Sequence, residues 1–256
     1  MTLPTLLIAL SICLYPLGAL FSAQHVKPYS ERCLFHKEAS NYLLPPTHPL
    51  KPLLDNIFQD PTVLHDMESL TKAGFLVINS RKRVPMRIIK HPLVPGYLFK
   101  VFLEEETTPN TVDKQNKNFL FRCQAAETIR SILSSNRITN FVVPDKWLYL
   151  PPTNEMTDKR RFVLVVTEMH ILNEEESRMA WMTKITPQHL QEYLLIKERV
   201  PLSQTIPANI PYTQEGQFAF IDTEKRSFKV TKLENFLSPE MQVCWRELLL
   251  SSPNNW

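Results

Sequence analysis

Short apolar segments dominate the middle of the chain and predict β-strands. Residues 75–80, 85–92 and 96–105 are rich in β-branched or aromatic side chains and end at turn formers or charged residues. Two further segments of this kind, 138–150 and 161–171, follow later in the chain. We therefore expect five strands, with an interruption between the third and the fourth.

Apolar residues at helical spacing predict four helices around these strands. The interruption itself carries the clearest helical pattern, over residues 119–136, where apolar side chains recur three and four positions apart. Helices are also expected over 62–73, 185–198 and 238–250, and the last two begin at Thr-Pro and Ser-Pro pairs. The fold class predicted from these patterns is α+β.

Polar and proline-rich stretches fill the remaining positions and are expected to be irregular. Residues 25–60 are interrupted by prolines and favour short helices and loops. The polar run 105–118 is expected to be a loop that leads into the helix, and the charged residues 174–177 to be a solvated loop. A late apolar segment, 218–225, favours one more strand near the end of the chain.

The amino-terminal segment differs from everything that follows. Residues 3–23 contain no charged side chain, and the stretch is about long enough to span a bilayer. We expect an exported or membrane-anchored protein, with a cleaved signal peptide and a retained anchor both open. A buried amino-terminal helix is the alternative, although Pro4 and Pro16 would interrupt it.

Composition narrows the classes of function. With 256 residues, 43% hydrophobic and 21% charged residues and a net charge of +3, the chain is typical of a folded protein and not of a strongly basic nucleic-acid binder. Only four glycines are present, which leaves little material for a glycine-rich phosphate loop. Three cysteines follow the leader, namely Cys33, Cys123 and Cys244. Their wide spacing argues against a zinc site, while one disulfide stays open.

The segment 200–224 resembles the stretch of protein kinases that runs from the catalytic loop to the metal-binding aspartate. Its IPANI run is similar to the family's K-P-x-N-I and aligns Asn209 with the family's asparagine, and FIDTE aligns Asp222 with the metal-binding aspartate. Upstream, GYLFKVF is similar to the third-strand motif V-A-I-K and aligns Lys100 with the phosphate-contacting lysine. Three strands, a helix, two strands and a helix also follow one another in the kinase order.

The resemblance implies a two-lobed kinase-like fold and a nucleotide site. After the leader (1–23) and a helical or looped extension (24–74), a five-stranded antiparallel small lobe would occupy about 75–170 and a reduced helical large lobe about 171–256. ATP and magnesium would be the cofactors. The implied nucleotide-binding residues are Lys100, its ion-pair partner Glu127, Glu168 at the hinge and Asn209, and the implied metal ligands are Asp222 and Asn209.

Three departures from the family pattern argue against phosphotransfer. Gln204 stands where the family has its catalytic-base aspartate, and glutamine cannot accept a proton. Thr223 and Glu224 replace the Phe-Gly after the metal-binding aspartate, and no glycine-rich loop precedes Lys100. Only 34 residues follow Asp222, too few for the usual large lobe.

We therefore expect a kinase-like binding module that binds a nucleotide or a protein partner and lacks catalysis. Two alternatives stay open: an atypical kinase in which Glu224 acts as the base, and a secreted interaction protein with only the inherited shape. Each aligned residue also has an ordinary interpretation, because strand lysines and helix glutamates are usually solvated and asparagine is common in turns.

Overall fold

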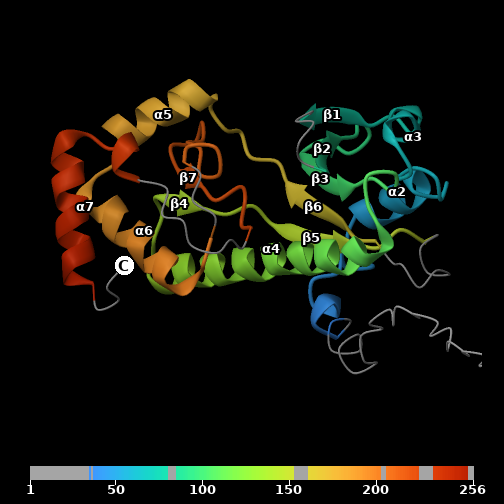
Figure 1. Ribbon diagram of the computed structural model, residues 1–256, viewed down its shortest axis with the longest axis horizontal. Coiled ribbons are helices and arrows are strands. Elements are labelled where there is room, and N and C mark those ends of the chain that lie inside the picture. The colour runs from blue at the N-terminus through green and yellow to red at the C-terminus, as the bar shows by residue number, and fades with distance from the viewer. Residues whose placement is uncertain are drawn as a thin grey trace, which may run out of the picture.

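The chain forms an α+β structure in which one long helix joins a sheet half to a helical half (Figure 1). The computed structural model describes residues 35, 37–79, 85–152, 161–202, 206–224 and 233–252. The expected leader, the carboxyl end of the late segment 218–225, and Gln204 lie outside these residues. None of the helices in the described ranges is long and apolar enough to cross a bilayer.

The sheet half is built on the five predicted strands. In spatial order they are β1 (Leu76–Asn79), β2 (Met86–Lys90), β3 (Tyr97–Phe102), β6 (Val163–Thr167) and β5 (Lys146–Tyr149), and every neighbouring pair is antiparallel. The third strand therefore lies in the middle of the sheet. The prediction of a five-stranded antiparallel sheet is confirmed.

Helices cover both faces of this sheet. On one face, α2 (Leu50–Ile57) and α3 (Met67–Lys72) bury apolar residues against inward-facing strand residues. On the other face lies α4 (Pro109–Ser135), together with the short turn of helix at 37–40. Because successive strand residues point to opposite faces, β2, β3, β5 and β6 each supply side chains to two separate cores.

The amino-terminal helices differ from the prediction in their starting points. The expected helix over 62–73 is only α3, and its N-cap is Asp66, whose carboxylate accepts a hydrogen bond from the Ser69 N–H at 2.7 Å. Upstream of this helix, Asp60 closes a turn by accepting from the Thr62 N–H at 2.8 Å. Gly74 ends the helix with a φ of 87°, a left-handed conformation that glycine adopts without strain.

The polar run 105–118 is helical in its greater part, so the loop predicted there is wrong. Helix α4 begins at Pro109, because proline is well placed in a first turn, where its missing N–H costs nothing. The polar residues of this early part serve a purpose in the fold. Asn116 accepts a hydrogen bond from the buried Phe162 N–H at 3.2 Å, and Asn118 accepts one from Arg122 Nε at 2.7 Å.

The predicted strand 138–150 is divided between the two halves. It forms β4 (Phe141–Val142) in the helical half and β5 in the sheet half, with Pro144 between them. Strand β4 pairs in parallel with β7 (Phe218–Ala219), the strand formed by the first two residues of the late apolar segment. This small parallel ladder sits among the helices of the second half (Figure 1).

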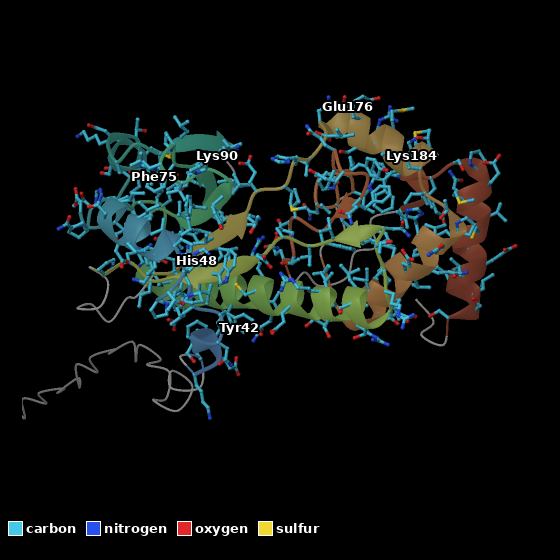
Figure 2. All side chains as sticks on the ribbon, turned by 180° about the vertical axis from the view of Figure 1, so that it is seen from behind. Tyr42, His48, Phe75, Lys90, Glu176 and Lys184 are labelled. Carbon is cyan, nitrogen blue, oxygen red and sulfur yellow. The ribbon has the colours of Figure 1, made fainter. Side chains whose placement is uncertain are left out.

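Within the part of the second half that the structure describes, the helical elements are α5 (Glu174–Thr183), α6 (Pro187–Arg199), the 3₁₀ turn η2 (Leu233–Phe236) and α7 (Pro239–Ser251). The loop predicted at 174–177 is wrong, because these residues form the first turn of α5. Asn173 and Glu176 form a reciprocal capping box there, and the three glutamates lie at the helix end that favours negative charge. Figure 2 shows Glu176 and Lys184 towards the two ends of this helix.

Two of the cysteines lie in the described ranges, and both are free thiols. Cys123 is buried against the sheet and Cys244 on α7 is partly buried. Burial raises the pKa of the Cys123 thiol to about 12, which keeps it protonated and unreactive. Cys33 lies outside the described residues.

Candidate functional site

Two lysines project from the sheet towards α4. On β3, Phe99 and Val101 point into the core under α2 and α3, so Lys100 between them points the other way. On β5, Leu148 packs against α4, and Lys146, two positions earlier, lies on the same side. Both lysines are buried, at 6% and 7% exposure, which is uncommon for this residue type.

Helix α4 supplies a third buried cation between these lysines and the helical half. The side chain of Arg122 is only 3% exposed and forms ion pairs with Asp222 and Glu224, the latter at 3.5 Å between Nη2 and Oε2. Asn118, one turn earlier on α4, accepts from Arg122 Nε and donates to Glu224 Oε1 at 3.4 Å. The guanidinium is thus held on three sides.

The segment after β7 brings the negative charges to this place. Lys100 Nζ lies 3.5 Å from Asp222 Oδ1, although 121 positions separate the two residues along the chain (222 − 100 − 1). Thr223 is fully buried; its hydroxyl accepts from Lys146 Nζ at 2.7 Å and donates to the Arg122 carbonyl oxygen at 2.7 Å. We call Lys100, Arg122, Lys146, Asp222 and Glu224 the charge cluster.

Basic groups outnumber carboxylates in the charge cluster, three against two. Burial lowers the pKa of Lys100 to about 7, and the neighbouring Arg122 lowers it further in the same direction. Burial and the charges of Lys100 and Arg122 also hold the pKa of Lys146 well below its ordinary value. The site therefore holds its cations at a cost that a bound anion would offset.

Asn209 reaches the same region through its backbone. Its carbonyl oxygen accepts a hydrogen bond from the Ile221 N–H at 3.2 Å, which places residue 209 beside the residue that precedes Asp222. Lys100 and Asp222, aligned from distant parts of the sequence, are therefore neighbours in the structure, and the backbone of Asn209 lies beside the residue that precedes Asp222. This proximity does not by itself assign a ligand.

Glu127 does not take the position expected of it. It is exposed on α4 and accepts a hydrogen bond from the Tyr42 hydroxyl, whereas Lys100 pairs with Asp222. The predicted ion pair between Lys100 and Glu127 is wrong. The helix residue that faces the lysine is Arg122, which carries the opposite charge to the one expected.

Glu168 lies at the passage from the sheet half to the helical half. Its N–H donates to the Gly96 carbonyl oxygen at 2.8 Å, and its carboxylate pairs with Lys90 of β2. Figure 2 shows Lys90 on the side of the sheet half that is turned towards the helices. This pair ties the connecting segment to the sheet.

No protein-family model and no curated protein matches this chain significantly.

Sequence reasoning missed two members of the charge cluster, Arg122 and Lys146. Arg122 could have been suspected, since Phe119 and Cys123 on either side of it belong to an apolar stripe and an arginine near such a stripe needs a buried partner. For Lys146, the two-residue period of a strand was the available signal, because it places the lysine on the face that also carries Leu148.

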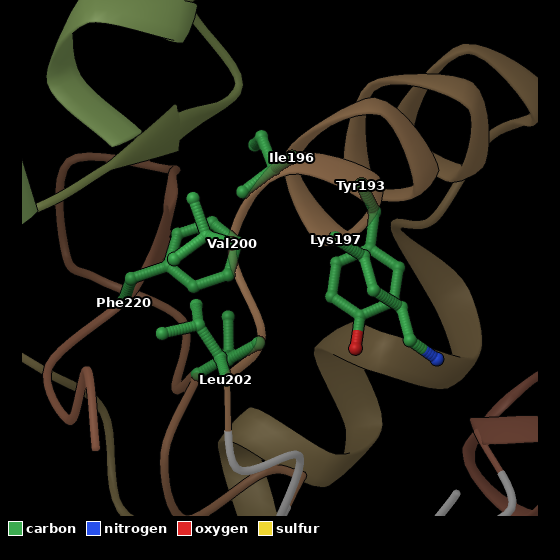
Figure 3. Close-up of a pocket in the computed structure, with 7 residues that line it drawn as sticks. Tyr193, Ile196, Lys197, Val200, Leu202 and Phe220 are labelled. Carbon is green, nitrogen blue, oxygen red and sulfur yellow. The ribbon is translucent and has the colours of Figure 1, made fainter. Parts of the chain in front are cut away.

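A second feature of the helical half is a small apolar pocket (Figure 3). Its lining includes Tyr193 and Lys197, which extend from the same face of α6. Among the described residues, the Tyr193 hydroxyl is a buried polar atom without a hydrogen-bond partner. Burial raises the pKa of this tyrosine, so the hydroxyl stays protonated. An unpaired buried hydroxyl destabilises the fold.

Removal of this hydroxyl is expected to stabilise the protein. Tyr193→Phe should raise the free energy of unfolding by about 1 kcal/mol, because it removes a desolvated group and leaves the ring packing unchanged. Urea denaturation measures the change. Tyr149→Phe is the matched control, since the Tyr149 hydroxyl donates to Asp55 at 2.9 Å and its loss should destabilise. A loss of stability in Tyr193→Phe would show that the hydroxyl has a partner in solution.

Proposed function

We propose that this protein is an exported or membrane-tethered, kinase-like module that binds a nucleotide between its two halves without transferring phosphate. The observation that carries the proposal is the approach of Lys100 Nζ to Asp222 Oδ1, at 3.5 Å. The kinase resemblance had aligned these two residues with the phosphate-contacting lysine and the metal-binding aspartate.

The arrangement of elements supports the same interpretation. After α2 and α3, three antiparallel strands precede the long helix. Following the short strand β4 in the helical half, two further strands, β5 and β6, complete the sheet before the chain continues into α5 and α6. This is the chain order that the resemblance predicts for a small lobe running into a large lobe. Glu168 and the segment after it would then form the hinge, where backbone groups hold a base.

The absence of catalysis in this proposal rests on residue chemistry. Gln204, which aligns with the catalytic base, has no group that could accept a proton. Glu224 is the carboxylate that could replace it, as in an atypical kinase. Its contacts with Arg122 and Asn118 favour a structural role, because they occupy both carboxylate oxygens.

A third candidate, an interaction protein with only the inherited shape, has one observation in its favour. The side chains of Lys100 and Arg122 are 8% and 3% exposed, as expected of groups that lock two halves together. Burial lowers the pKa of both Lys100 and Lys146, and a phosphate bound beside them would favour their charged forms, which supports the nucleotide over a purely structural role.

Thermal denaturation with and without ATP tests the nucleotide. At a ligand concentration of 100 times Kd, binding should stabilise the fold by about 2.7 kcal/mol, which raises Tm by roughly 5–10 °C for a chain of this size. Lys100→Met should abolish the rise. Lys184→Met, which removes an exposed lysine at the end of α5, is the matched control and should retain it.

Two results would contradict the proposal. A wild-type Tm that ATP leaves unchanged would remove the nucleotide and favour the interaction protein. Transfer of radiolabelled phosphate that Asp222→Asn abolishes would show an active kinase. Mass spectrometry of the mature amino terminus separately tests export, since removal of a segment ending near Ala23 would identify a cleaved signal.

A further inference from the structure

Asp222 is arranged as the partner of two cations and not as a metal ligand. A magnesium ion takes carboxylate oxygens at about 2.0–2.1 Å and needs an almost regular octahedron of oxygens around it. Here Oδ1 of Asp222 pairs with Arg122 and lies 3.5 Å from Lys100 Nζ. A divalent cation at this oxygen would stand beside a guanidinium and an ammonium, so the residues present do not fit magnesium.

The charge cluster itself supplies what magnesium supplies in a kinase. Magnesium neutralises and orients the phosphate oxygens of the nucleotide. Arg122 carries a planar fork of N–H donors suited to phosphate, and the ammonium groups of Lys100 and Lys146 each offer three donors. Thr223 accepts from one of the Lys146 donors and so fixes the direction of that side chain.

The carboxylates mark the side from which a ligand would enter. The side chains of Asp222 and Glu224 are 19% and 22% exposed, several times more than Arg122 at 3%. They therefore lie between solvent and the buried cations. An incoming phosphate would compete with Asp222 for Lys100 and Arg122, and the carboxylate would have to move aside.

We propose that the site binds the phosphate groups of a nucleotide directly on Lys100, Arg122 and Lys146, without a divalent metal ion, and that Asp222 is a competing anion that closes the empty site. This inference rests on the proposed nucleotide function and specifies the chemistry of its site. It reverses the role that the kinase resemblance assigns to Asp222.

Calorimetric titration of the full-length protein with ATP, in EDTA and in excess magnesium, distinguishes the two roles. Wild-type protein should bind ATP at least as tightly in EDTA as in magnesium. Asp222→Asn should tighten binding in EDTA by about tenfold, because it removes a negative charge within a few Å of the phosphates. A metal ligand predicts the opposite, a loss of binding in this variant.

Two further variants and a second ligand serve as controls for the titration. Glu224→Gln removes the second carboxylate and should also tighten binding in EDTA. It replaces Asp222→Asn in the test if that variant does not fold. Glu175→Gln, on the exposed surface of α5, should change nothing. Inorganic triphosphate, which lacks the base and sugar, should displace ATP from the wild-type protein.

Other results of the titration would refute either the metal-free site alone or the nucleotide function as well. Binding only in magnesium, lost in Asp222→Asn, would refute the metal-free site and leave the nucleotide function standing. ATP that triphosphate cannot displace would place the phosphates elsewhere and refute this inference alone. No binding in either buffer would refute both proposals.

Discussion

Replacing Arg122 with methionine is expected to lower the free energy of unfolding by about 3–5 kcal/mol, the typical cost of removing one partner from a buried ion pair. The arginine is 3% exposed and faces both Asp222 and Glu224. Methionine fills much of the same space but leaves the two carboxylates without their main counter-charge. Tm should fall by roughly 6–20 °C, measured by thermal denaturation.

Matched variants separate the charge from the volume. Arg178→Met removes an exposed arginine that pairs with Glu175 on α5 and should have no measurable effect. Adding Asp222→Asn to Arg122→Met should cost much less than expected from the two single variants, because the carboxylate that was stranded is then neutral. Simple addition of the two effects would mean that the arginine acts only by packing.

Trp181→Ala is expected to destabilise the helical half by about 3–5 kcal/mol, in the range of large-to-small core substitutions. The indole is fully buried, and its ring centre lies 4.6 Å from that of Phe218 in β7 and 5.9 Å from that of Tyr193 in α6. Its Nε1–H donates to the Ile210 carbonyl oxygen at 2.8 Å. Alanine would leave both a cavity and an unpaired carbonyl, measurable by urea denaturation.

A conservative variant divides this loss into two parts. Trp181→Phe keeps an aromatic ring in the core and removes the hydrogen bond to Ile210, so it should cost about 1–3 kcal/mol. Met179→Ala, on the exposed side of the same helix, should cost little. A loss in Trp181→Phe as large as in Trp181→Ala would assign the whole effect to the hydrogen bond and none to the cavity.

Local patterns were sufficient to predict most elements of the fold. Alternating or continuous apolar runs located all five strands of the sheet, and a Thr-Pro pair located the start of α6 at Pro187, with Thr186 as its N-cap. These signals work because they depend on neighbours within one turn or one strand. The early part of α4 was not predicted as a helix, because its polar residues, such as Asn116, have partners far away in the chain.

The candidate site could be predicted from the sequence only in part, for the same reason. Motif alignment brought Lys100 and Asp222 together, but it could not say which face of α4 is turned to them. Glu127 follows Arg122 by five positions, which is about 140° around a helix, so the two cannot both face the sheet. The division of the predicted strand 138–150 into β4 and β5 could not be predicted either. It depends on the parallel pairing of β4 with β7, which lies far away along the chain.

The long helix constrains how the two halves can move. Phe119, Leu120 and Cys123 of α4 belong to the core against the sheet, whereas its later apolar residues belong to the core of the helical half, namely Ala125, Ala126, Ile129, Ile132 and Leu133 (Figure 1). Bending such a continuous helix would break its backbone hydrogen bonds, so the softest relative motion is torsion about its long axis. Arg122 lies on α4 between these two groups of residues, so such a twist would displace its ion-pair partners Asp222 and Glu224 far less than the outer ends of the two halves.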